Sequence, residues 1–312
     1  MKDPRFPHFL PYSILRRRRL KRTIDRGIRD SRVYLALTFD VEKPFVSESQ
    51  VNSSNSVEDF LRSLSRDALE ERTSTLFIQG NLVERNGKWL SRLEAGGHTL
   101  GIHGYDHELW GGPTWFLGSK PLTTDEKERR LRSSLECFEK GGLKRPVLFR
   151  APNMLADDET LALLSRHGFV LDSSPPAFRG FPPLPTAVDS RLMRIPISSN
   201  PLFELKRSKG IAYCFYRLFD FRSIHNLCDE ELFSLIGNVC SLQASFGVPS
   251  HLVFLGHSWE FHDWGLKGRF GYCSTNNWNL LKNRLSKIEG STDVEYVTMT
   301  ELYKALRRDA HV

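Results

Sequence analysis

The chain has 312 residues, of which 40% are hydrophobic, so it can bury the core of one large α/β domain or two small ones. Its net charge of +7 is uneven, because residues 1–32 hold eleven Lys and Arg against three Asp and the remainder is nearly neutral. Because the charge is confined to the first residues, the rest of the chain is not expected to bind nucleic acid. No stretch reaches the roughly 18 uninterrupted apolar residues of a membrane-spanning helix.

Cysteine usage and the first residues both indicate a protein that stays inside the cell. The five Cys are scattered without a C-x-x-C spacing and their number is odd, which favours buried thiols over a disulfide framework. The first apolar stretch, FPHFLPYSIL, is interrupted by proline and precedes the cluster of positive charges, the reverse of a secretory signal. We therefore expect a cytoplasmic protein.

Residues 1–32 are predicted to form a basic arm, followed by a single body at residues 33–312. Apolar side chains in the arm could line one stripe of a helix that is otherwise covered by Arg and Lys: Leu15, Leu20, Ile24 and Ile28. Such a segment can lie on an anionic membrane, where each Lys or Arg contributes on the order of 1 kcal/mol. Peripheral contact with the inner face of the membrane through residues 13–30 is one interpretation. A solvated arm, or a helix that packs on the body, is an equally good one.

From residue 32 onward the chain alternates between strand-like and helix-like patterns. Apolar and β-branched runs predict strands at 32–40, 74–81, 98–102, 146–152, 168–174, 251–259 and 294–299. Helical spacing of apolar residues predicts helices at 57–72, 82–95, 124–140, 157–167, 227–246, 278–288 and 300–308. This alternation implies parallel strands with crossover helices. Residues 108–122 are predicted to form a long loop, and residues 175–222 give no clear prediction.

The stretch AGGHTLGIHGYDHELW at residues 95–110 contains the pair His103 and His107. Imidazoles four residues apart meet on one face if the backbone is helical or tightly wound, and both can then bind one metal ion. Catalytic zinc usually has three protein ligands and an open position. Asp40 and Glu42, which follow the first strand, are candidates for the third ligand.

Polar clusters follow five of the predicted strands. They are Asp40-Val41-Glu42, His103 with His107, Arg150-Ala151-Pro152-Asn153, Asp172-Ser173-Ser174 and His257-Ser258-Trp259-Glu260. One charged residue at a strand end is ordinary, but solvation alone does not require five. Because the carboxyl ends of parallel barrel strands converge on one rim, we expect these groups to form a site.

The order of these clusters resembles the polysaccharide deacetylase family, the NodB-homology group of carbohydrate esterases, over about residues 33–260. The strongest part is STLFIQGNLVERNGKWLSRLEAGGHTLGIHGYDH at residues 74–107, which is similar to the strand, helix and H-x-x-x-H block of that family. The resemblance implies an α/β fold, a distorted (β/α) barrel with about seven parallel strands. It also implies a hydrolase that removes N-acetyl groups from amino sugars with a divalent metal, commonly Zn²⁺, with Co²⁺ and Ni²⁺ as alternatives.

The resemblance also implies roles for the first two clusters. TFDVE, ending at Glu42, is similar to the family motif TFDD, whose first acid is the general base and whose second acid binds metal. Asp40 matches the base, but Val41 stands where the second acid would be. Glu42 is then the candidate third ligand beside His103 and His107. Two alternatives stay open: Asp40 binds the metal while Glu42 takes the proton, or metal binding is lost.

The remaining clusters match later family motifs. By the resemblance, Arg150 orients the base and the backbone N–H of Asn153 is an oxyanion donor. Asp172 would orient His257, which protonates the leaving amine. Glu260 neighbours His257 and is the type of residue that fixes an imidazole tautomer.

Three functions remain open at this point. We favour deacetylation of an N-acetylated glycan or glycan precursor, in which Trp110 and Trp259 could stack on sugar rings, although aromatic side chains are more often core. A hydrolase of small linear or cyclic amides on the same fold is the second. A non-catalytic relative that binds glycan or membrane is the third, and the loss of the adjacent acid at Val41 is its main support.

Overall fold

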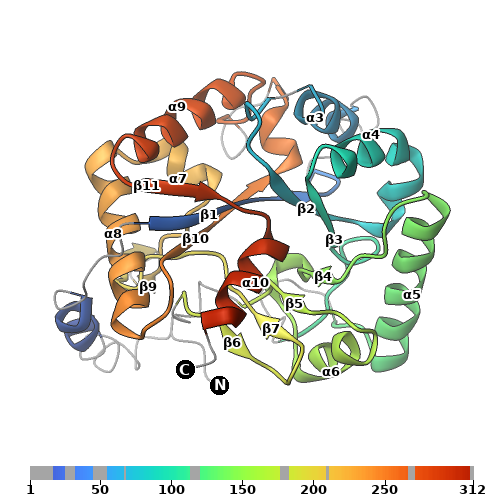
Figure 1. Cartoon of the computed structure of the whole chain (residues 1–312), viewed down its shortest axis with the longest axis horizontal. Coiled ribbons are helices and arrows are strands. Elements are labelled where there is room, and N and C mark those ends of the chain that lie inside the picture. Colours follow the sequence, from blue (N-terminus) through green and yellow to red (C-terminus); the bar gives the residue numbers. More distant parts are fainter. Residues whose placement is uncertain are drawn as a thin grey trace.

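Strand β1 (Arg32–Val41) is the centre of the sheet, because three other strands pair with it in parallel. The computed structural model describes residues 17–24, 32–44, 55–66, 68–112, 120–175, 183–208, 211–265 and 271–309. Nearly every side chain of β1 is buried, which explains its continuous apolar sequence, since parallel strands are covered on both faces. In Figure 1, β1 crosses the middle of the molecule.

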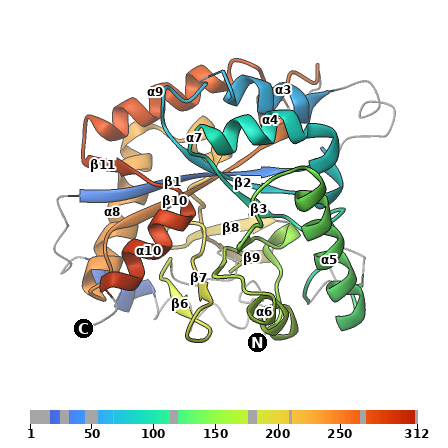
Figure 2. The same ribbon diagram turned by 45° about the vertical axis from the view of Figure 1, so that its right-hand side comes forward.

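The main sheet has nine strands and curls into an incomplete barrel (Figures 1 and 2). Its order is β10 (His251–His257), β1, β2 (Ser74–Ile78), β3 (Thr99–Ile102), β4 (Leu148–Phe149), β5 (Leu171–Asp172), β7 (Met193–Arg194) and β6 (Thr186–Ala187), with β11 (Asp293–Tyr296) also on β1. Within the described part of this sheet, β6–β7 is the one antiparallel pair. The predicted α/β fold, a distorted barrel of parallel strands, is therefore confirmed.

Helices surround the sheet (Figure 1). They are α3 (Ser56–Leu64), α4 (Val83–Ala95), α5 (Thr124–Lys140), α6 (Asp158–Arg166), α7 (Phe221–Asn226), α8 (Asp229–Ser245), α9 (Asn277–Glu289) and α10 (Met299–Asp309). Local sequence sets several of their ends. Thr123 and Glu126 form a capping box at the start of α5, and Asp157 accepts a bond from the backbone N–H of Thr160 at the start of α6.

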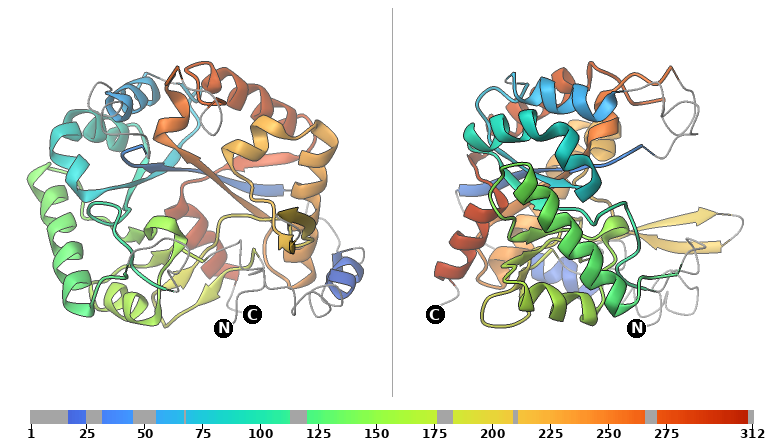
Figure 3. Two further views of the ribbon diagram at one scale, coloured as in Figure 1. Left: turned by 180° about the vertical axis from the view of Figure 1, so that it is seen from behind. Right: turned by 90° about the vertical axis from the view of Figure 1, so that its right-hand side faces the viewer.

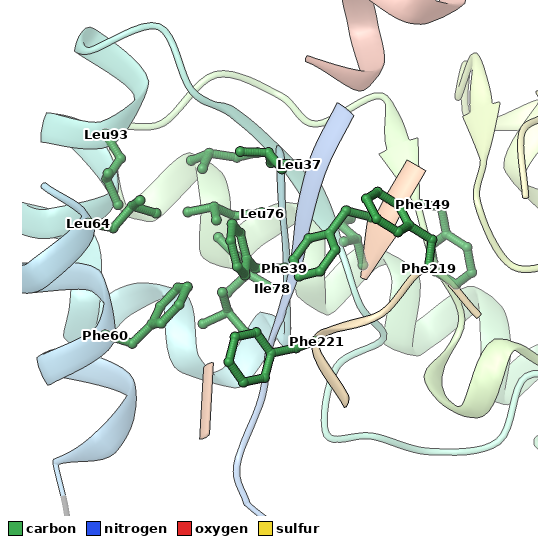
Figure 4. Close-up of a cluster of buried hydrophobic side chains, with 14 of the residues drawn as sticks. Leu37, Phe39, Phe60, Leu64, Leu76, Ile78, Leu93, Phe149, Phe219 and Phe221 are labelled. Atoms are coloured by element: carbon green, nitrogen blue, oxygen red, sulfur yellow. The ribbon is translucent and has the colours of Figure 1, made fainter. Parts of the chain in front are cut away.

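Two apolar cores lie on the two faces of the sheet. The larger one packs the surrounding helices on the strands, and Figure 4 shows Phe60 and Leu64 of α3 directed toward Phe39 and Leu76. The smaller one fills the concave face, where α10 contributes Leu302. The backbone N–H of Met299 donates to Thr75 Oγ1 at 2.8 Å, so the start of α10 is bonded to β2.

The structure shortens several predicted elements, three of them strongly. Strands predicted at 146–152 and 168–174 pair over only two residues each, because the residues that follow leave the sheet and carry the RAPN and DSS clusters. The predicted helix at 57–72 ends at Leu64. Residues 175–222, which gave no prediction, contain β6, β7, α7 and a hairpin of β8 (Glu204–Ser208) and β9 (Ile211–Phe215) that projects from the body in the right-hand view of Figure 3.

The basic arm is described at residues 17–24, which are helical, and at Arg32, which begins β1. This helix contacts the body, because Arg17 Nε donates to the carbonyl oxygen of Phe203 at 3.2 Å and Ile24 is buried. The remaining part of the predicted membrane-binding segment lies outside the described residues, as does the stretch 113–119 of the predicted long loop. Among the helices in the described ranges, none combines the length and hydropathy needed to cross a bilayer.

Candidate metal centre and active site

Three potential metal ligands meet just beyond the carboxyl ends of β1 and β3. Glu42 Oε2 lies 3.2 Å from His103 Nε2 and 3.0 Å from His107 Nε2. One ligand atom from each of these residues lies within 4.8 Å of the others. Burial alone would raise the pKa of the Glu42 carboxyl, but hydrogen bonds from both imidazoles outweigh burial and hold that pKa well below its ordinary value. The cluster therefore offers an ionised carboxylate and two imidazoles.

Val41 explains how both acids reach the same place. Side chains alternate along extended backbone, so residues 40 and 42 lie on one side and residue 41 lies on the other. Val41 is fully buried in the larger core, whereas Asp40 and Glu42 both line the cavity of the site. One residue, here Val41, must therefore separate two acids that point to the same side of an extended backbone.

His107 reaches Glu42 through a tight turn rather than a helix. Gly104 and His107 both have positive φ angles, +66° and +61°. The Glu108 carboxylate accepts the backbone N–H groups of Tyr105 and Asp106 at 3.1 and 2.5 Å, which holds this turn closed. A positive φ at a residue with a side chain is strained and is often found at functional sites.

Arg150 contacts both the first acid and the first histidine. Its guanidinium donates to Asp40 Oδ1 at 2.8 Å and to Ser173 Oγ at 2.9 Å. Its carbonyl oxygen lies 3.0 Å from His103 Nδ1 and accepts a hydrogen bond from it, which orients Nε2 toward Glu42. Asp40 Oδ2 is 3.9 Å from His103 Nε2, close to the cluster but farther from the imidazoles than Glu42 is.

The predicted pairing of Asp172 with His257 is wrong. Asp172 Oδ2 accepts a bond from Arg194 Nε at 2.9 Å, and its other oxygen accepts bonds from Ser174. The physical reason is strand order, because β2, β3 and β4 separate β5 from the β1–β10 pair where His257 lies. Asp172 instead fixes Ser174, whose hydroxyl accepts the backbone N–H of Ala151 at 2.7 Å beside Arg150.

Glu260 is the carboxylate that faces His257. Its Oε2 lies 3.4 Å from His257 Nδ1 and accepts the backbone N–H of His257 at 2.7 Å. Tyr272 donates its hydroxyl to Glu260 Oε1 at 2.8 Å. Burial alone would lower the pKa of the His257 imidazole, but the charge of Glu260 outweighs burial and raises that pKa to about 9. His257 is therefore protonated at neutral pH.

The two tryptophans that were predicted to stack on sugar rings lie in different environments. Trp110 is fully buried with its ring 5.0 Å from that of Phe149, so the prediction that it stacks on a sugar is wrong. Trp259 donates Nε1–H to Glu42 Oε1 at 2.9 Å and stacks on the His257 ring at 4.9 Å. Trp259 thus orients a potential metal ligand, although it also lines the cavity.

A cavity of about 330 Å³ joins these groups. Among the residues predicted from sequence, those lining it are Asp40, Glu42, His103, His107, Asn153, His257 and Trp259, whereas Arg150 and Asp172 lie behind it. Asn153 has a left-handed backbone conformation with a φ of +56°. The lining also includes Asp220 and Arg222, which sequence reasoning missed. The D-x-x-S pattern at residues 220–223 was an available signal, because Asp220 caps α7 by accepting the Ser223 N–H at 2.8 Å.

Comparison with known proteins agrees with this geometry. Residues 28–171 match the family model described as polysaccharide deacetylase. Residues 28–171 therefore carry the sequence pattern of the polysaccharide deacetylase family. Over 114 residues it is 31% identical to the peptidoglycan deacetylase-like protein FGM2 of Gibberella zeae, a match that spans 36% of this chain and 31% of that protein. The chain thus spans less than a third of the length of this curated relative.

Two solved structures share the fold of this chain. A structure described as a putative polysaccharide deacetylase from Mycobacterium smegmatis has a TM-score of 0.56 at 18% identity, covering 91% of this chain and 93% of that one. PuuE allantoinase has a TM-score of 0.53 at 12% identity, covering 87% of this chain and 89% of the other. At these identities the likeness concerns the fold.

The donor set suits the divalent ion that the family resemblance implies. Two imidazoles and one carboxylate with an open position form a known type of catalytic zinc site. The partners of these ligands are also present, since Arg150 orients the His103 imidazole and Trp259 fixes the Glu42 carboxylate. Glu42, His103 and His107 can therefore hold a metal ion.

Proposed function

We propose that this protein is a metal-dependent hydrolase that removes an N-acetyl group from an amino sugar of a glycan or glycan precursor. The observation that carries the proposal is the Glu42–His103–His107 cluster, which shares one cavity with Asp40 and His257 in a chain that matches the polysaccharide deacetylase family model over residues 28–171. A non-catalytic relative would have no need of this combination. The proposed ion is Zn²⁺, with Co²⁺ or Ni²⁺ as alternatives.

Glu42, His103 and His107 would hold the ion. When bound, a divalent ion polarises the substrate carbonyl and lowers the pKa of a coordinated water from 15.7 toward ~7. Of the two acids, Glu42 is the better ligand because its Oε2 contacts both imidazoles, whereas Asp40 Oδ2 is 3.9 Å from one of them. This geometry favours Asp40 as the base.

Asp40 is arranged to accept a proton from the attacking water. Arg150 binds its Oδ1 at 2.8 Å, which leaves Oδ2 on the side of the metal cluster. A carboxylate that is positioned within reach of the attacking water can act as the general base. Arg150 orients Asp40 from behind the cavity.

His257 is arranged to protonate the departing nitrogen. Its Nδ1 faces Glu260, so Nε2 is the atom that can transfer a proton to the substrate. The imidazole is protonated at neutral pH because Glu260 raises its pKa. We assign the backbone N–H of Asn153 as a donor to the oxyanion, in agreement with its place in the cavity lining.

The test compares metal content and acetate release for the wild type, His103→Ala and His167→Ala. His167 is a matched control because it bonds to Glu128, away from the cavity. We expect about one divalent ion per wild-type and control chain, with acetate release from N-acetylglucosamine oligosaccharides. His103→Ala should lose both. Equal acetate release by His103→Ala would contradict the proposal, and hydrolysis of small cyclic amides alone would identify the alternative amidase.

We also propose that the enzyme acts in the cytoplasm at the inner face of the membrane. The support is the helix at residues 17–24, in which the side chains of Arg18, Arg19, Lys21 and Arg22 are exposed. Because Ile24 is buried, this contact would be electrostatic rather than by insertion of an apolar stripe. Sedimentation with lipid vesicles tests this proposal. We expect the protein to bind vesicles that contain phosphatidylserine but not vesicles of phosphatidylcholine alone, and to be released at high salt. Equal binding to both kinds of vesicle would contradict the proposal.

A further inference from the structure

Arg222 is a cation on the wall of the active-site cavity that the proposed chemistry does not use. It is the second residue of α7, and its side chain is exposed. Asp220, two residues earlier, pairs in parallel with Leu255 of β10, which places the start of α7 beside the strand that carries His257. Arg222 therefore borders the same space as the metal cluster.

The carboxylates of the cavity are bonded to other groups. Asp40 pairs with Arg150, and Glu42 contacts both histidines of the metal cluster. Glu260 accepts bonds from the His257 backbone and from Tyr272. Asp220 caps α7 by accepting the backbone N–H of Ser223 at 2.8 Å.

The Arg222 guanidinium differs from these groups. Across the ranges that the structure describes, no acceptor or aromatic ring lies within bonding distance of it, and the carboxylates that share its cavity face other partners. A guanidinium presents a planar fork of donors that matches a carboxylate or phosphate in a bidentate geometry. An open cation beside a reaction site is therefore suited to an anionic group on the substrate.

We propose that Arg222 binds a carboxylate or phosphate substituent of the amino sugar and so selects acidic N-acetylated sugars over neutral ones. This rests on the proposed deacetylase function. A cavity of about 330 Å³ is near the small end of ligand sites, which run from roughly 300 to 1,000 Å³. It suits one sugar with its substituents, so the anion belongs to the sugar that is deacetylated or is attached directly to it.

The experiment measures acetate release from three sugars: an N-acetylglucosamine oligomer, N-acetylmuramic acid with its carboxylate, and N-acetylglucosamine 1-phosphate. The wild type, Arg222→Gln, Arg222→Lys and Arg85→Gln are compared. Arg85 is the matched control because it is an exposed arginine on α4 that does not line the cavity. The two acidic sugars distinguish a carboxylate from a phosphate as the preferred anion.

We expect the wild type and Arg85→Gln to prefer one acidic sugar over the neutral oligomer. In Arg222→Gln, KM for that acidic sugar should rise about tenfold or more, as loss of a charge-assisted hydrogen bond implies, with little change in kcat. Arg222→Lys should recover part of the preference, because it restores the charge without the fork. An equal preference in the wild type and Arg222→Gln would overturn the proposal while leaving the deacetylase function intact.

A binding measurement separates this inference from the proposed function. If none of the sugars releases acetate, calorimetry with N-acetylglucosamine 1-phosphate and N-acetylmuramic acid still tests Arg222. Binding by the wild type that weakens about tenfold or more in Arg222→Gln, but not in Arg85→Gln, supports the anion site. Equal affinities of the wild type and Arg222→Gln, or no binding by either, overturn it.

Discussion

The carbonyl oxygen of Arg150 lies 3.0 Å from Nδ1 of His103, so one residue positions both the proposed base and a proposed metal ligand. Its side chain binds Asp40, while its backbone carbonyl orients the imidazole. The two contacts come from different parts of the same residue. They can therefore be separated by substitution, since a new side chain at residue 150 removes the first contact and leaves the backbone carbonyl in place.

Arg150→Lys should lower kcat by about 10²-fold with little change in metal content. A lysine keeps the charge but cannot bond both Asp40 and Ser173 as the guanidinium does, so the base is misplaced, and small misplacements can cost this much. Acetate release and metal analysis of the purified variant provide the measurement. Loss of metal together with activity would show that the side chain, and not the carbonyl, holds His103.

Trp259→Phe should weaken metal binding by about 10–100-fold, as is typical when a partner of a metal ligand is lost. Phenylalanine preserves an aromatic ring beside His257 but removes the Nε1–H that binds Glu42 at 2.9 Å. Competition with a zinc chelator measures the affinity. Trp110→Phe is the control, because Trp110 packs on Phe149 in the core. Equal affinities for the wild type and Trp259→Phe would show that Glu42 needs no support from Trp259.

The sequence predicts the parts of the site that depend on local rules. Alternating patterns and capping residues locate most elements within a few residues. Clusters at strand ends identify five residues that the structure brings together at the cavity: Asp40, Glu42, His103, His107 and His257. The alternation of side chains in extended backbone also explains Val41, although the sequence alone left the roles of Asp40 and Glu42 open. The local sequence pattern thus identifies residues at the strand ends whose side chains face the cavity.

Partnerships between distant segments could not be predicted in the same way. The pairing of Asp172 with Arg194 depends on the neighbour relation of β5 and β7, two strands of two residues each with little periodicity to detect. Arg222 reaches the cavity because Asp220 pairs with Leu255 in a single bridge, which no sequence pattern encodes. Tertiary contacts decide these positions.

Gly256→Ala should destabilise the fold by about 1–3 kcal/mol, the usual effect of overpacking a core. A Cβ at residue 256 would lie 2.8 Å from Cδ1 of Phe39, whose ring is held among Phe60, Phe254 and Phe261. Denaturant unfolding measures the change. Gly87→Ala is the matched control on α4, where the added Cβ meets only a carbonyl oxygen at 3.8 Å, and it should stabilise the protein by about 0.5–1 kcal/mol. Equal stability of Gly256→Ala and the wild type would contradict the tight packing around Phe39.

The pH dependence of kcat should show which carboxylate sets the pKa of His257. The imidazole must be protonated to donate, so the rate of the wild type should fall as the pH rises through about 9, the pKa that Glu260 sustains. Glu260→Gln removes the negative charge that raises this pKa. The alkaline limb should then move to lower pH, toward the ordinary histidine value near ~6.5. Asp172→Asn, the partner suggested by family resemblance, should leave the limb in place because Asp172 bonds to Arg194 and Ser174. A shift in Asp172→Asn with none in Glu260→Gln would reverse the assignment and restore Asp172 as the residue that sets the acidity of His257.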